Sequence, residues 1–118
     1  DPHVKEELAA CSPYAHPAGK CDLVIVPCIS GGEKRFEGCV PLDMSACTEN
    51  ILLEAQTLGL GAVWLGIYPE QDRMEAVAKV IGAEDGRIPF ALIAVGHPKE
   101  MLEPRSPKRF DMSRVRWV

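Results

Sequence analysis

The sequence has 118 residues, of which 47% are hydrophobic and 25% charged, with a formal net charge of −4. These proportions are typical of a globular domain and exclude an intrinsically disordered chain. No run approaches the roughly 20 apolar residues that cross a bilayer, and no signal-peptide pattern opens the chain, so we expect a cytoplasmic protein without a membrane partner.

The first predicted element is a helix that begins at the start of the chain. Asp1 is suited to cap the helix and Pro2 to occupy its first position. Val4, Leu8 and Cys11 then recur at helical spacing and predict a buried face. A Ser-Pro pair ends the pattern.

The second predicted element is a buried strand from Leu23 to Ile29, because this run is apolar and rich in β-branched residues. Pro27 has no backbone N–H and therefore predicts an edge or a bulge at that point. Residues 30–42 contain three glycines and several charges, and we expect a mobile loop that contributes to substrate selection.

A long helix is predicted next, with Asp43 as its N-cap and Gly59 as the left-handed residue that closes it. Apolar residues extend around most of its circumference. We therefore expect this helix to be buried, either centrally or against a partner subunit.

The remaining elements alternate. Residues 61–67 form an apolar strand-like run, residues 74–81 follow at helical spacing, Gly82 ends that helix, and residues 88–95 form a third strand. Periodicity alone therefore favours a parallel α/β sheet.

The tail differs in charge from the rest of the chain. Residues 99–118 hold 6 Lys and Arg against 3 Asp and Glu, whereas residues 1–98 hold 7 against 14. We interpret residues 1–118 as one domain with a basic C-terminal tail at 99–118. The acidic body argues against a nucleic-acid partner.

Common site patterns are missing. The five cysteines contain no Cys-x-x-Cys pair and the three histidines are scattered, so we predict neither a metal site nor a disulfide framework. The glycines at 59, 61 and 66 follow a helix and precede a strand, which is the reverse of the dinucleotide-binding order. We assign no catalytic side chain.

An ordered series of short motifs runs through the second half of the chain. It comprises Asp43-x-Ser45-Ala46, Asn50-Ile51-Leu52-Leu53-x-Ala55, Leu58-Gly59-Leu60-Gly61, Trp64-Leu65-Gly66 and Phe90-Ala91-Leu92-Ile93-Ala94-Val95-Gly96-His97-Pro98. In this order and at these separations, the motifs resemble the core of the nitroreductase family, and the resemblance spans essentially the whole chain.

The resemblance implies an α+β fold rather than a parallel α/β one: a mixed, mainly antiparallel sheet flanked by helices, in an intertwined homodimer. It also implies two FMN sites at the subunit interface. The implied activity is hydride transfer from NAD(P)H through FMN to nitroaromatic, quinone or similar small-molecule acceptors.

The resemblance also implies the cofactor-binding residues. It places Trp64, Leu65 and Gly66 beside the isoalloxazine ring, with the Leu65 N–H near flavin N5. It places Lys108 and Arg109 at the FMN phosphate. The alternative interpretations are that Trp64 is a packing residue and that the two cations are solvated tail charges.

The chain departs from the family pattern at its start, where the family has an arginine- and serine-rich phosphate-binding segment. We therefore expect an N-terminally truncated sequence that corresponds to the C-terminal two-thirds of a family member. The alternative function is a non-catalytic dimeric module of the same fold that has lost FMN binding.

Overall fold

The computed structural model describes residues 1–100 and 110–118, and within them the chain forms one main sheet with helices on both faces. The sheet has the strand order β1-β5-β3. Its strands are β1 (Leu23–Ile25), β3 (Gly61–Gly66) and β5 (Ala91–Gly96). A second, two-stranded sheet pairs β2 (Cys28–Ile29) with β4 (Ile88–Pro89).

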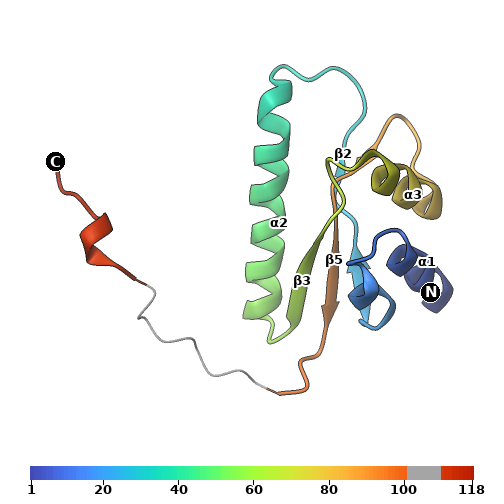
Figure 1. The fold of residues 1–118 in the computed structure, drawn as a ribbon, viewed down its shortest axis with the longest axis horizontal. Coiled ribbons are helices and arrows are strands. Elements are labelled where there is room, and N and C mark those ends of the chain that lie inside the picture. Colours follow the sequence, from blue (N-terminus) through green and yellow to red (C-terminus); the bar gives the residue numbers. More distant parts are fainter. Residues whose placement is uncertain (101–109) are drawn as a thin grey trace.

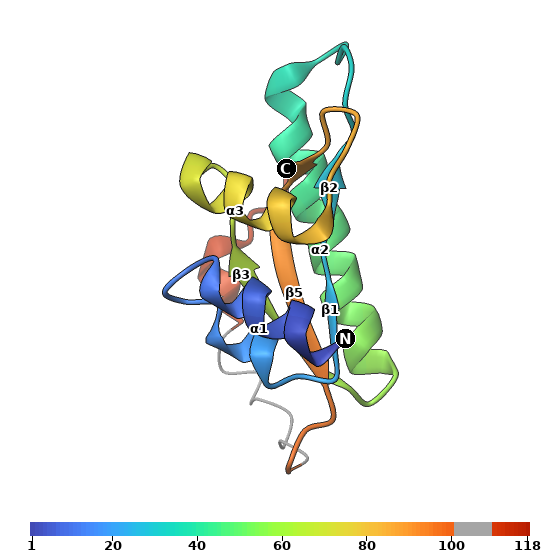
Figure 2. The same cartoon turned by 90° about the vertical axis from the view of Figure 1, so that its right-hand side faces the viewer.

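The helices cover opposite faces of the main sheet, as Figure 1 shows. One face carries α2 (Val40–Thr57), and the other carries α1 (Pro2–Ala10) and α3 (Gln71–Ile81). Figure 2 views the sheet from the side of α1 and α3. Three short 3-10 helices are η1 (His16–Gly19), η2 (Glu37–Cys39) and η4 (Met112–Arg114).

Every strand pairing in the described part of the chain is antiparallel. The α+β fold that the resemblance implied is therefore confirmed, and the parallel sheet that periodicity favoured is wrong. Spacing along one strand or helix reports only which face is buried, so it carries no information about strand direction.

The start of α1 agrees with the prediction. The carboxylate Oδ1 of Asp1 accepts a hydrogen bond of 2.8 Å from the N–H of His3, and Pro2 is the first helical residue. Leu8 is 3% exposed and joins the core beside α3. The helix ends at Ala10, immediately before the predicted stop.

Two strands that were predicted as single elements are each divided in the structure. Pro27 separates β1 from β2, and Phe90 separates β4 from β5. The Phe90 N–H donates to the Pro27 carbonyl at 2.9 Å, so the two breaks lie opposite each other. The two segments stay paired across these breaks, but the register shifts by one residue, from Ile25 opposite Ile93 to Cys28 opposite Pro89.

The predicted start of α2 is wrong and its predicted end is correct. The helix begins at Val40 rather than after Asp43, because Pro41 fits its first turn. Asp43 lies within that turn, where a carboxylate still favours the helix dipole. Gly59 has φ +72°, and the Leu60 N–H reaches back to the Ala55 carbonyl at 2.8 Å.

The long helix α2 buries one face only. Ala55 packs with Ile93 and Val95 of β5, while Leu42 and Leu53 are 69% and 58% exposed. Of the two alternatives expected for this helix, central burial within the chain is not observed, and burial against a partner subunit stays a prediction. An apolar stripe on α2 stays open in the single chain.

The opposite face of the sheet holds the other large apolar cluster. Leu65 and Leu92 point from the sheet toward Val77 of α3 and Leu8 of α1. None of the helices in residues 1–100 and 110–118 combines the length and apolar character that a bilayer span requires.

Candidate functional site

The candidate site lies at the C-terminal end of β3, around residues 64–66. In the described part of the chain β3 hydrogen-bonds to β5 on one side only, from Gly61 opposite Gly96 to Gly66 opposite Ala91. Alternate main-chain N–H and C=O groups of an edge strand point away from its neighbour. This edge therefore offers backbone donors and acceptors to a ligand.

The three predicted flavin-contact residues are consecutive on β3, and their side chains alternate. Leu65 is 7% exposed, and its side chain packs in the core. Trp64 projects from the other face and is 36% exposed. Its role beside the flavin therefore stays a prediction, as does the alternative of a packing role.

Trp64 belongs to a row of three aromatic rings. Its ring centroid is 5.8 Å from that of Phe90, and the Phe90 centroid is 5.6 Å from that of Tyr68, with interplanar angles of 45° and 29°. Phe90 is buried, while the outer two rings are partly exposed. Such pairs contribute about 0.5–1.5 kcal/mol beyond the area they bury, so Phe90 holds both exposed rings in place.

Gly66 leaves open space beside this row. A Cβ added to Gly66 would meet no atom of the described chain within 4 Å. Arg73 donates from Nη1 to the Gly66 carbonyl at 3.4 Å, and its guanidinium lies 5.7 Å from the ring centroid of Tyr14. The positively charged Arg73 side chain is therefore held near Gly66, at the C-terminal end of β3.

The geometry fits the ring system of FMN. A planar isoalloxazine needs an open edge, a partly exposed aromatic or apolar surface and backbone donors, and residues 64–66 provide all three. The other predicted contacts, Lys108 and Arg109, lie outside the described residues. The phosphate contact therefore stays a prediction.

Sequence reasoning did not identify Tyr68, Phe90 or Arg73 as site residues. Phe90 was predicted only as part of a strand and of the last family motif. The sequence did contain a signal for the aromatic row. Trp64 and Tyr68 are four residues apart, and residues four apart on an extended chain lie on one face. Arg73 lies on α3 and could not be assigned from periodicity.

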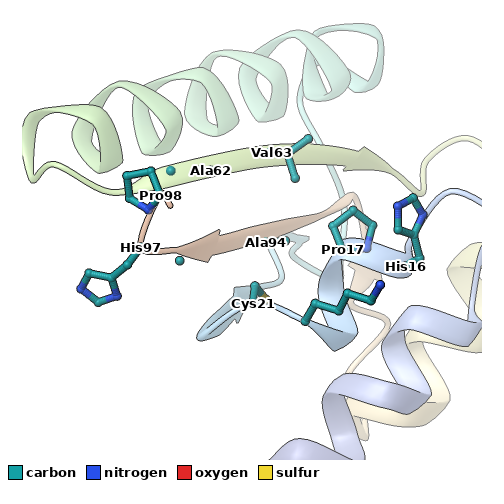
Figure 3. Close-up of a pocket in the computed structure, with 11 residues that line it drawn as sticks. His16, Pro17, Cys21, Ala62, Val63, Ala94, His97 and Pro98 are labelled. Atoms are coloured by element: carbon teal, nitrogen blue, oxygen red, sulfur yellow. The ribbon is translucent and has the colours of Figure 1, made fainter. Parts of the chain in front are cut away.

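A separate groove of about 480 Å³ crosses the opposite end of the sheet (Figure 3). Its floor includes Val63 of β3 and Ala94 of β5, and its rim includes His16 and His97. The Asp22 carboxylate accepts hydrogen bonds from the His97 N–H at 3.0 Å and pairs with His97 Nδ1 at 2.9 Å. These contacts lower the pKa of Asp22 below its usual value.

The cysteines offer no redox or metal centre within residues 1–100 and 110–118. All five are free thiols, and burial raises the pKa of Cys11 and Cys28. In the same part of the chain, His, Cys, Asp and Glu side chains form no group of three that could hold a metal ion.

The chain was compared with known proteins. The model of the family described as "Nitroreductase family" matches residues 6–97. A protein of Methanothermobacter thermautotrophicus named "Putative NADH dehydrogenase/NAD(P)H nitroreductase" is 34% identical over 110 residues, which is 93% of this chain. The chain spans 56% of that relative's length.

The fold of this chain also matches those of solved structures. The crystal structure of a protein named "Putative NADH Oxidase" from Clostridium acetobutylicum has a TM-score of 0.83 and 32% identity, over 98% of this chain and 69% of the other. An FMN-dependent nitroreductase from Clostridium difficile R20291 has a TM-score of 0.82 over 99% of this chain and 70% of the other. At 18% identity the latter shows a shared fold.

Proposed function

The chain belongs to the nitroreductase family. From this membership we propose that it is the part of an FMN-dependent oxidoreductase that contacts the flavin ring. The proposed reaction moves a hydride from NAD(P)H to a nitroaromatic, quinone or similar acceptor. When bound, FMN would supply the two-electron chemistry. A cytoplasmic location agrees with the NAD(P)H supply and with five free cysteines.

The observation that carries this proposal is the open edge of β3 at residues 64–66. Neighbouring amides of a strand point to opposite sides, so one amide of the Leu65–Gly66 pair faces outward. We propose Leu65 as the donor to flavin N5, as the resemblance implies. A fixed N–H at that position stabilises negative charge that develops on the ring during reduction.

Side chains would orient the ring around that contact. Trp64 presents a partly exposed aromatic surface beside the edge, and Gly66 leaves the space that a planar ring needs. Lys108 and Arg109 remain our candidates for the phosphate, since a guanidinium and an ammonium both pair well with a phosphate dianion.

We also propose that the protein acts as a homodimer in which α2 contributes to the interface. Leu42, Ala46 and Leu53 are exposed at helical spacing on α2, and a second subunit would cover them. The FMN site would then lie at the seam between the subunits.

The experiment is a spectrum of the purified protein with FMN. The expected result is a yellow protein with bound-flavin absorption bands that bleach when NAD(P)H is added without oxygen, and that return when a quinone is added. Protein that stays colourless and takes up no added FMN would contradict the proposal and favour the non-catalytic module.

A further inference from the structure

Arg73 contacts the proposed flavin site, and the proposed function gives it no role. It lies in the first turn of α3, and its Nη1 donates to the Gly66 carbonyl at 3.4 Å. The guanidinium carbon lies 5.7 Å from the ring centroid of Tyr14, which belongs to the loop between α1 and η1. The side chain therefore joins three segments at the end of β3 where we place the flavin ring.

The stability of α3 does not explain a cation at this position. The N-terminus of a helix carries a partial positive charge, so a cation is unfavourable in the first turn and favourable in the last. Lys79 follows that rule in the last turn, whereas Arg73 departs from it. Departures from local preference are expected at functional sites.

The charge of Arg73 has no acidic partner in the part of the chain that the structure describes, because none of the ion pairs there includes it. On α3, Asp72 is exposed, and the Glu75 carboxylate accepts a hydrogen bond from Gln71 at 2.7 Å. The carbonyl and the aromatic ring that contact Arg73 are neutral groups. The cation is therefore held in place while its charge stays available to an anion at the end of β3.

The contact with Gly66 brings this charge within range of the proposed ring. Leu65, the proposed donor to flavin N5, is the residue before Gly66, and consecutive Cα atoms are about 3.8 Å apart. With the 3.4 Å contact added, the guanidinium lies within roughly 10 Å of that donor, which is about one Debye length at 0.1 M salt. Salt therefore screens the charge only in part.

We propose that Arg73 is a positioning residue of the flavin site: through the Gly66 carbonyl it holds the end of β3, and its charge stabilises the reduced ring. The inference rests on the proposed function, because it concerns the cofactor of that same site. A hydride carries two electrons and one proton, so its transfer to a neutral ring leaves one negative charge on the ring. A fixed cation favours that charged state over the oxidised one.

The first test measures the reduction potential of bound FMN, a quantity that does not depend on turnover. Arg73→Gln removes the charge and is expected to weaken the binding of reduced FMN about fivefold more than that of oxidised FMN, because water screens part of the interaction. For a two-electron couple, this ratio corresponds to a potential lower by about 20 mV. A spectroscopic titration of the FMN-loaded protein against a reference dye gives the potential.

Two further variants separate the charge at this position from general effects. Arg73→Lys keeps a positive charge and should keep the affinity ratio within about twofold of wild type. Lys79→Gln removes a charge about 9 Å further along the axis of α3 and should leave the potential unchanged. Equal potentials in wild type and Arg73→Gln, or an equal shift in Lys79→Gln, would overturn the inference.

The second test observes the contact itself in flavin-free protein. The Ile67 amide belongs to the same peptide group as the Gly66 carbonyl, so its NMR signal reports the hydrogen bond that Arg73 donates. Arg73→Gln should shift this signal, while the amide signal of Leu23, on the far strand of the sheet, stays in place. An Ile67 signal that does not move would contradict the positioning role.

The two hypotheses fail in different ways. Wild-type protein that takes up no FMN would refute the proposed function, and the role of the charge with it. Wild-type protein that binds FMN and is reduced by NAD(P)H, with the same FMN potential in Arg73→Gln, would refute this inference alone.

Discussion

Gly66 and Gly59 are glycines with different physical roles. Gly66 lies in β3 outside the positive-φ region, with open space where a Cβ would point, whereas Gly59 requires φ +72° to close α2. Gly66→Ala should therefore leave the free energy of unfolding unchanged or slightly raised. It should weaken FMN binding about tenfold, because the methyl group takes space that the ring needs.

Gly59→Ala is the matched control for that prediction. The same added methyl group meets no neighbour, but a left-handed conformation costs an L residue about 1–2 kcal/mol. The expected result is lower stability in urea denaturation with unchanged FMN affinity per folded molecule. Weaker stability and unchanged FMN affinity in Gly66→Ala would contradict the assigned site.

Asp22 joins the start of β1 to the end of β5 through His97. Its lowered pKa means that the folded state favours the carboxylate, so the stabilisation is present above about pH 4 and is lost as pH falls through the lower folded-state pKa. Asp22→Ala should lower the thermal midpoint near pH 6. The difference from wild type should shrink as pH falls through the lowered folded-state pKa of Asp22, and a pH-independent difference would exclude this contact as its cause.

At the scale of elements, α2 links the fold to the proposed dimer. Leu53→Glu places a charge on the exposed apolar stripe, and we expect dissociation to monomers with an intact fold. Sedimentation velocity measures the dissociation and circular dichroism the fold. Cys47→Glu adds the same charge at an exposed position about 120° around α2 from Leu53 and should stay dimeric. A dimer in both variants would place the interface elsewhere.

Sequence patterns predicted the existence and type of each helix and strand well, but periodicity gave the wrong strand direction and did not predict the break at Phe90. The capping of α1 by Asp1 and the closure of α2 by Gly59 are local, so the sequence alone was sufficient. The breaks at Pro27 and Phe90 depend on a contact between distant segments. Propensity along one segment does not report such a contact.

The site was predictable to a similar extent. The motif resemblance pointed to residues 64–66, and the structure places them on an open edge. The aromatic row could not be found in the same way, because Phe90 joins Trp64 and Tyr68 only after β5 pairs with β3. The row of aromatic rings therefore exists only because β5 pairs with β3.

For the whole molecule, the described residues supply a sheet whose edge strand β3 carries residues 64–66, and an apolar stripe on α2. The chain spans 56% of the length of its relative from Methanothermobacter thermautotrophicus. The central claim is that the flavin lies against the edge of β3.

Amide NMR of the isotope-labelled protein during titration with FMN tests that claim most directly. We predict that the N–H signals of Leu65 and Gly66 shift most and saturate together with flavin binding, while that of Leu23, on the far strand of the sheet, stays in place. Saturable FMN binding that leaves Leu65 and Gly66 unshifted would contradict the account.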